Sequence, residues 1–281
     1  MNADAPPAAR LIGLSKHYPV RLGLGRKTVL RELDLTIPNG ATLGLVGPNG
    51  SGKSTLQRIL AGVERASSGT VEVLGGALAD PEVRARIGFV PEDSPFPGEL
   101  DARAVLDLLG SLQGIRRRET RTRGAELLER VGLADHARSP LRRFSRGMLR
   151  RFALAQAWLH RPDLILLDEP TAGLDAQGFD VLDELLAEAR GRGAAVVFTS
   201  HLVSDLHEHC DEIVVLLDGA VAARGAPWEL FRREGCWRLE LEGLDEARLP
   251  ELEAWVTAHG GTVRSSSPAG RTLFELYHGK P

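Results

Sequence analysis

The chain has 281 residues, of which 43% are hydrophobic, and its formal net charge is −3. This composition supplies one large α/β core with room for a small additional module, and it excludes an intrinsically disordered chain. The slightly negative charge excludes the global positive field on which nucleic-acid binding depends, so no nucleic-acid partner is expected.

The sequence carries no sign of a membrane span or a signal peptide. No run approaches the roughly 18 consecutive apolar residues that a span requires, and residues 1–7 lack the basic and apolar regions of a signal peptide. Cys210 and Cys236 have no metal-ligand spacing and fit a reducing compartment. We therefore expect a cytoplasmic protein that does not itself cross a bilayer.

The first part of the chain shows strand patterns followed by a helix. Short β-like runs at 10–14 and 33–37 flank a loop rich in glycine and arginine at 21–27, which predicts an antiparallel β layer. Residues 41–46 form an apolar run typical of a buried strand, and residues 54–61 place apolar side chains at helical spacing. The sequence thus predicts a strand, a short loop and a helix in succession.

The loop between this strand and helix matches the phosphate-binding pattern G-x-x-x-x-G-K-[ST]. Its glycines let successive backbone N–H groups face one anion, and the following helix adds the positive end of its dipole. We predict that Lys53 reaches the β and γ phosphates, that Ser54 binds Mg²⁺ and that Thr55 contacts an α-phosphate oxygen. The predicted ligands are a nucleoside triphosphate and Mg²⁺, and the nucleotide-binding residues are Gly47, Pro48, Asn49, Gly50, Ser51, Gly52, Lys53, Ser54 and Thr55.

A dinucleotide-binding fingerprint is the nearest alternative for this loop. Its third glycine would have to stand where the sequence has Thr55. Lys53 would also have no role in such a site, so the triphosphate interpretation is favoured.

The middle of the chain predicts a helical insert followed by further strands. The pattern is helical from about 93 to 155, and apolar strand signals return at 164–167, 194–198 and 213–217. Near-continuous apolar strands indicate a parallel sheet that is covered on both faces. The predicted fold class is therefore α/β, with a P-loop NTPase core, an N-terminal antiparallel β layer and a helical insert.

The C-terminal part has a different pattern. It predicts a strand near 237–241, an amphipathic helix near 245–259 and a strand near 272–277. We interpret these elements as a small α+β extension without a recognisable catalytic pattern. The expected division is a nucleotide-binding domain over 1–234 and an accessory module over 235–281.

Two carboxylates follow the apolar strand at 164–167. Ligands bind at the carboxyl ends of strands in open α/β sheets, and Asp168 and Glu169 stand there. Asp168 is predicted to hold Mg²⁺, and Glu169 to act as the general base on the attacking water. His201 follows the next strand and is expected to hydrogen-bond the γ-phosphate.

With these motifs in place, the chain resembles the ATP-binding subunit of ABC transporters over residues 9 to about 230. In that family two such domains enclose two ATP molecules, and the phosphate loop of one faces a signature motif, usually Leu-Ser-Gly-Gly-Gln, of the other. The corresponding segment here is Phe144 to Met148, and it departs from the usual motif except at its serine and one glycine. The resemblance implies that ATP is contacted across the dimer by Ser145, Arg146, Gly147 and Met148. The form of this segment resembles the type-2 branch, which consists largely of exporters.

Three more positions are assigned through the resemblance. Tyr18 matches the aromatic residue that stacks on adenine, and Asp175 matches the loop that links the two active sites. Glu92 stands where the family usually has a glutamine that touches Mg²⁺ and the permease. A carboxylate can also bind Mg²⁺, so Glu92 is a candidate ligand with Ser54 and Asp168.

The leading hypothesis is an ATPase subunit that dimerises on ATP, as a homodimer or with a paired subunit, and drives a separate transmembrane permease for export. Such a subunit would be cytoplasmic and peripheral at the inner face of the cell membrane. One alternative is a soluble ABC-type ATPase acting on nucleic acid or the ribosome, although such proteins usually carry two nucleotide domains or a long coiled-coil insert. A second alternative is a non-catalytic regulatory binder, which the presence of Glu169 and His201 disfavours.

Overall fold

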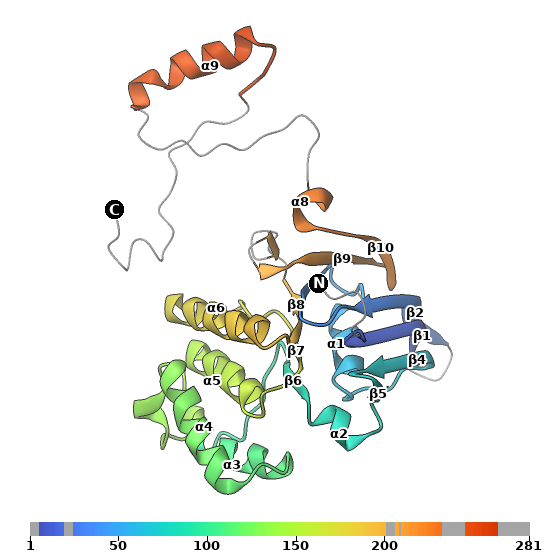
Figure 1. Cartoon of the computed structure of the whole chain (residues 1–281), viewed down its shortest axis with the longest axis vertical. Helices are drawn as coiled ribbons and strands as arrows, with labels where there is room; N and C mark the ends of the chain where they lie inside the picture. Colours follow the sequence, from blue (N-terminus) through green and yellow to red (C-terminus); the bar gives the residue numbers. More distant parts are fainter. Residues whose placement is uncertain (1–5, 20–24, 201–205, 208, 232–244, 264–281) are drawn as a thin grey trace. The chain divides into compact units, whose positions relative to one another are not determined.

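The computed structural model describes residues 6–19, 25–200, 206–207, 209–231 and 245–263 (Figure 1). The chain divides into two compact units, Met1–Phe231 and Arg232–Pro281. Among the described helices, none is both long enough and apolar enough to cross a membrane.

The first unit contains the strands and helices that the sequence predicts, together with strands at 68–73, 76–77, 87–90 and 220–225 and short helices at 81–84 and 227–230 that it did not. Its strands are β1 (Ala9–Pro19), β2 (Arg26–Ile37), β3 (Thr42–Val46), β4 (Ser68–Val73), β5 (Gly76–Ala77), β6 (Ile87–Val90), β7 (Leu164–Leu167), β8 (Ala195–Thr199), β9 (Glu212–Leu217) and β10 (Ala220–Gly225). Its helices are α1 (Lys53–Leu60), α2 (Pro81–Arg84), α3 (Ala102–Leu112), α4 (Arg117–Arg130), α5 (Arg146–Trp158), α6 (Ala176–Gly191) and α8 (Pro227–Leu230), with short 3₁₀ turns at Ala134–His136 and Leu141–Arg143.

A six-stranded sheet forms the centre of this unit, in the order β10-β9-β3-β8-β7-β6. Strand β3 pairs in parallel with β8 and β9, β7 pairs in parallel with β6 and β8, and only β10 is antiparallel to its neighbour β9. Alternate residues of β7 enter opposite hydrophobic clusters, with Ile165 in one and Leu164 and Leu166 in the other. The parallel sheet is therefore buried on both faces, which confirms the prediction from its apolar strands.

A second, antiparallel sheet covers one side of this core. Its order is β2-β1-β4-β5, and β1 pairs antiparallel with both β2 and β4. Apolar residues of β1 and β2 share a cluster with α1 and with one face of β3, β7 and β8. The antiparallel β layer predicted from the N-terminal alternation is thus present (Figure 1).

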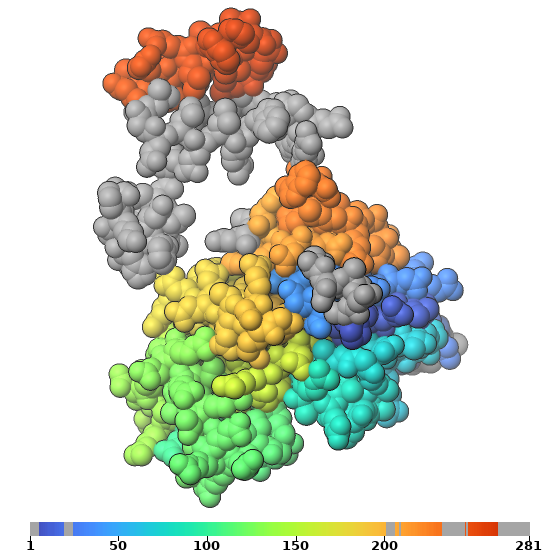
Figure 2. All heavy atoms as spheres, viewed as in Figure 1, coloured from blue at the N-terminus to red at the C-terminus, as the bar shows by residue number. Residues whose placement is uncertain are grey.

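The other face of the central sheet is covered by helices. Residues from α3, α4, α5 and α6 share one hydrophobic cluster with alternate residues of β7 and β8. Figure 2 shows the atoms of the helical segment, in green, apart from the blue atoms of the antiparallel layer. Helix α5 is the most enclosed of these helices, because every residue from Arg150 to Ala155 is buried.

The second unit is described only in part. A 3₁₀ turn at Glu246–Arg248 leads into α9 (Leu249–Ala258), which together occupy the predicted helix at 245–259. The strands predicted at 237–241 and 272–277 lie outside the described residues.

Candidate functional site

The phosphate-binding loop runs from the end of β3 to the start of α1. Gly52 immediately precedes the helix with φ 107°, a conformation that side-chain-bearing residues rarely adopt. A Cβ atom at Gly47 would lie 2.2 Å from the carbonyl oxygen of Leu216, so no side chain fits there. The close path of this loop therefore requires glycine at both positions.

The Lys53 ammonium lies against this loop. Its Nζ donates hydrogen bonds to the carbonyl oxygens of Gly47 at 2.7 Å and Pro48 at 3.2 Å, and the residue is 7% exposed. Helix α1 has no side-chain cap at its N-terminus. The buried Ser51 hydroxyl has no hydrogen-bond partner within the described part of the chain. A lysine, a free hydroxyl and an uncapped helix N-terminus at one loop fit a bound polyphosphate.

Ser54 and Asp168 provide oxygen atoms on two elements that are tied together. Ser54 is the second residue of α1, and Asp168 directly follows β7 with only 1% of its surface exposed. Gln57 Nε2 donates a hydrogen bond to the Leu167 carbonyl at 3.0 Å, which joins α1 to the end of β7. A hydroxyl and a carboxylate are the kind of ligands that Mg²⁺ prefers, so these residues fit the ion.

Thr199 orders both acidic residues at the end of β7. Its Oγ1 donates a hydrogen bond to Asp168 Oδ1 at 2.9 Å and accepts one from the Glu169 backbone N–H at 2.8 Å. Glu169 is 6% exposed and has φ 50°. Such a backbone conformation costs on the order of 1–3 kcal/mol and persists where the surroundings fix it. His201, the third predicted residue of this edge, lies outside the described residues.

Glu92 stands near the same edge of the sheet. It lies two residues beyond β6, whose last residue, Val90, accepts a hydrogen bond from the Asp168 N–H at 2.8 Å. The Glu92 residue is exposed, whereas Asp168 is buried. The carbonyl oxygen of Glu92 accepts a hydrogen bond from Arg150 at 3.1 Å.

Tyr18 lies on β1 close to the last residue of the phosphate-loop motif. Burial is the largest cause that raises the pKa of Tyr18, and a hydrogen bond with Glu64 raises it further, while a hydrogen bond with Thr55 lowers it. The Lys16 ammonium lies 4.9 Å from the centre of the tyrosine ring. The phenol is therefore placed beside Thr55, the last residue of the phosphate-loop motif.

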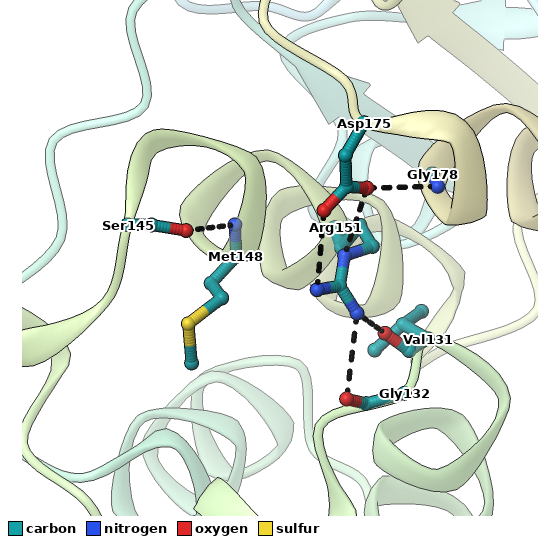
Figure 3. Close-up of polar contacts among 7 residues, drawn as sticks. All are labelled: Val131, Gly132, Ser145, Met148, Arg151, Asp175 and Gly178. Atoms are coloured by element: carbon teal, nitrogen blue, oxygen red, sulfur yellow. Dashed lines mark hydrogen bonds and ion pairs between the residues drawn. The ribbon is translucent and has the colours of Figure 1, made fainter.

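The predicted signature segment begins helix α5 (Figure 3). The Ser145 hydroxyl accepts a hydrogen bond from the Met148 N–H at 3.2 Å and so forms the N-cap of the helix. Arg146 is exposed to solvent. A Cβ atom at Gly147 would lie 3.2 Å from Asp175 Oδ2, so the glycine lets the start of α5 approach the loop before α6.

Asp175 joins several helices through one carboxylate (Figure 3). Its Oδ1 accepts a hydrogen bond from the Gly178 N–H at 2.9 Å and caps α6. The Arg151 guanidinium pairs with the same carboxylate, with Nε 3.4 Å from Oδ1. Arg151 also donates to the carbonyl oxygens of Val131 and Gly132, just after α4. The loop before α6 is thus fastened to both α5 and the end of α4.

Substitution of Asp175 separates its two structural contributions. Asp175→Ala should lower the free energy of unfolding by about 1 kcal/mol or more, because the cap of α6 is lost. Asp175→Asn retains a capping oxygen and removes only an ion pair that contributes at most about 1 kcal/mol, since the Asp175 side chain is 49% exposed. Urea unfolding should therefore rank alanine below asparagine. Equal losses in the two variants would contradict a contribution from the cap.

The structure gathers the predicted site residues into two sets. One set surrounds the phosphate loop and the carboxyl ends of β6 and β7, and the other consists of residues 145–148 with Asp175. Arg150, Arg151 and Thr199 were not assigned roles from the sequence. A sequence signal for the two arginines does exist, because both stand just before the apolar run 152–155. In the structure both arginines are only 6% exposed.

Comparison with known proteins identifies the family of the chain. The profile described as "ABC transporter" matches residues 30–172. An uncharacterized ABC transporter ATP-binding protein of Synechocystis sp. is 35% identical over 90% of this chain and 74% of its own length. The Nod factor export ATP-binding protein I of Ralstonia nicotianae is 33% identical over 95% of this chain and 81% of its own length.

A solved structure adds the nucleotide state of a similar protein. It is a dimeric ATP-binding cassette in a post-hydrolysis state, bound to ADP and Pi. The two chains share 26% identity with a TM-score of 0.72, over 78% of this chain and 98% of the other. The family resemblance and the fold expected from the sequence are both confirmed. With its glycine-lined phosphate loop and paired carboxylates, the chain therefore belongs to the ABC transporter family as an ATP-binding and ATP-hydrolysing protein.

Proposed function

We propose that the chain is the ATPase subunit of an exporter, that it dimerises on ATP as a homodimer or with a paired subunit, and that it drives a separate transmembrane permease. The observation that carries this proposal is the contact between the signature segment and Asp175. Gly147 brings the N-terminus of α5 against the loop before α6. The start of α5, with exposed Arg146, therefore lies beside the Asp175 loop, and in the proposed dimer this loop links the two active sites.

The residues of the phosphate loop and β7 have distinct roles in the proposed hydrolysis. The Lys53 ammonium leaves the loop carbonyls and neutralises the β and γ phosphates, while backbone N–H groups at the start of α1 bind phosphate oxygens. Glu169 orients the attacking water and accepts its proton. Mg²⁺, when bound by Ser54 and Asp168 with Glu92 as a candidate ligand, supplies charge neutralisation to the phosphates. Ser145 and Gly147 contact the ATP bound to the opposite subunit.

The proposed permease contacts the helical insert and the Glu92 loop. Glu92 is exposed, and its carbonyl is held by a side chain of α5, so the loop offers an exposed residue on a fixed backbone. The export direction is supported by the similar protein whose name includes Nod factor export. In this arrangement the chain is cytoplasmic and peripheral at the inner face of the membrane, where the permease holds it.

Phosphate release from MgATP tests the proposed activity against the alternatives. The purified full chain should release phosphate, and added RNA or DNA should leave the rate unchanged. A rate that rises with nucleic acid in a salt-sensitive manner would favour the soluble ATPase acting on nucleic acid. ATP binding without phosphate release, both alone and with membranes that contain the permease, would favour the regulatory binder.

The exposed position of Arg146 gives a test of the proposed dimer. Arg146→Glu should weaken ATP-driven dimerisation roughly tenfold or more, because a carboxylate at this position repels the phosphates of the opposite subunit. Analytical ultracentrifugation with ATP in the absence of Mg²⁺ measures the dissociation constant of the dimer. Arg117→Glu is the matched control, since Arg117 is an exposed arginine at the start of α4. An unchanged dissociation constant in Arg146→Glu would show that Arg146 does not lie in the dimer interface.

A further inference from the structure

Arg150 is a buried arginine that has no role in the function proposed so far. It is the fifth residue of α5, and 6% of it is exposed. An arginine is almost never this deeply buried unless its donors are satisfied. Burial is the largest influence on its pKa and lowers it, whereas the nearby charges of Asp168, Glu92 and Glu169 raise it.

The Arg150 guanidinium binds backbone carbonyls in two separate segments. Its Nη1 donates to Pro91 at 2.7 Å and to Glu92 at 3.1 Å. Its Nη2 donates to Asp168 at 2.7 Å and to Glu169, and its Nε donates to the carbonyl of Pro170 at 3.2 Å. The two ends of the fork therefore hold the loop after β6 and the segment after β7 at the same time.

This arrangement depends on the shape of the arginine side chain. The guanidinium offers five N–H donors in a rigid planar fork, whereas the lysine ammonium concentrates three donors at one point. A lysine at position 150 could reach one segment or the other, but it could not bridge them with the same geometry. The number and spread of the acceptors thus match arginine specifically.

We propose that Arg150 is a positioning residue that couples the Glu92 loop to the catalytic Glu169, and this inference rests on the proposed function. The Glu169 backbone has φ 50°, and the bond from Arg150 to its carbonyl is one of the contacts that hold it there. Ser145, the residue proposed to contact the opposite ATP, caps the N-terminus of the same helix (Figure 3). A shift of this helix would therefore move Ser145 together with the backbone of the two segments that Arg150 holds.

The test compares Arg150→Lys and Arg150→Gln with the unaltered full chain. Both variants should keep one ATP bound per chain and a KM for ATP within about twofold, because the phosphate loop is not touched. Their kcat should fall roughly 10- to 100-fold, because Glu169 loses its fixed position. The ATP stoichiometry excludes a misfolded fraction as the cause, and the lysine variant should retain more activity than the glutamine variant.

Hydrogen exchange provides a readout that a merely stabilising residue would not give. In both variants, amide exchange should rise roughly tenfold or more in peptides covering 91–94 and 168–172, and it should rise in both peptides together. Arg123→Met is the matched control, since Arg123 Nη2 donates to the Trp158 carbonyl at the other end of α5. This control should leave both peptides and kcat unchanged.

The outcomes separate this inference from the proposed function. Wild-type kcat and exchange in a folded Arg150 variant would overturn the coupling, and so would a change in only one of the two peptides. If neither variant folds, hydrogen exchange of the unaltered chain is measured during an ATP titration. The coupling requires that the amides of both peptides become protected at the same ATP concentration, and protection of only one peptide would overturn it. A wild-type chain that binds ATP without hydrolysing it would instead overturn the proposed function.

Discussion

Replacement of Glu169 by glutamine is expected to preserve ATP binding and to slow hydrolysis roughly 100-fold or more. The amide keeps the size of the carboxylate and the backbone contacts with Thr199 and Arg150, but it cannot accept a proton from water. ATP should then hold two chains together, because the step that opens the dimer no longer occurs. Light scattering of Glu169→Gln, with ATP and without, measures the conversion of monomer to dimer.

Two further observations complete this experiment. Glu126→Gln, which changes an exposed glutamate of α4, should hydrolyse ATP at the wild-type rate. Wild-type turnover in a pure Glu169→Gln sample would show that another group is the base. A monomer with and without ATP would mean that the segment from Ser145 to Met148 cannot close the dimer alone and that the permease is needed for assembly.

Lys53→Ala is expected to abolish detectable nucleotide binding. The lysine ammonium is the charged group that the loop directs at the phosphates, and its loss should weaken ATP binding by roughly 100-fold or more. The backbone of the loop should persist, because Gly47 and Gly52 fix its path without the lysine. Isothermal titration with ATP measures the affinity, and thermal unfolding without ATP checks that the fold is retained.

A lysine away from the site serves as the control for charge. Lys27 lies on β2 and is exposed, so Lys27→Ala removes one positive charge without touching the loop. Its affinity for ATP should equal that of the wild type. If Lys53→Ala binds ATP with unchanged affinity, the nucleotide does not occupy this loop.

The fold was predictable from the sequence where the spacing of apolar residues fitted only a strand or only a helix. The apolar run at 164–167 coincides with β7, and the strand and helix around the phosphate loop are displaced by only one residue. Helix α1 begins at Lys53 rather than Ser54, because the carbonyl oxygen of Gly52 already accepts the first helical hydrogen bond, from the Leu56 N–H at 2.8 Å. Alternating apolar residues predicted the antiparallel layer, because such a sheet can be buried on one face only. Continuous apolar runs predicted the parallel layer, because a parallel sheet is buried on both faces.

The contacts that organise the site were less predictable from the sequence. The partners of Arg150 are backbone carbonyls, which every residue carries, so no residue type marks them in the sequence. Thr199 follows the predicted strand at 194–198, but its bonds to two consecutive residues depend on the register between β7 and β8. The motif predicted that Ser145 contacts phosphate. Its second role, as the N-cap of α5, could not be predicted because the sequence did not define where the helix begins.

The consecutive positions of Arg150 and Arg151 impose a length constraint on the chain. Side chains at adjacent positions of a helix point about 100° apart, and here one serves the Glu169 segment and the other the Asp175 loop. Inserting or deleting one residue between Ser145 and Arg150 would rotate both guanidinium groups by about 100° relative to the cap. Because residues 150–155 are all buried, this part of α5 has no solvent-facing side that could absorb the change. Substitution at exposed Arg146 should therefore be tolerated by the fold, whereas a single-residue insertion or deletion in this stretch should not.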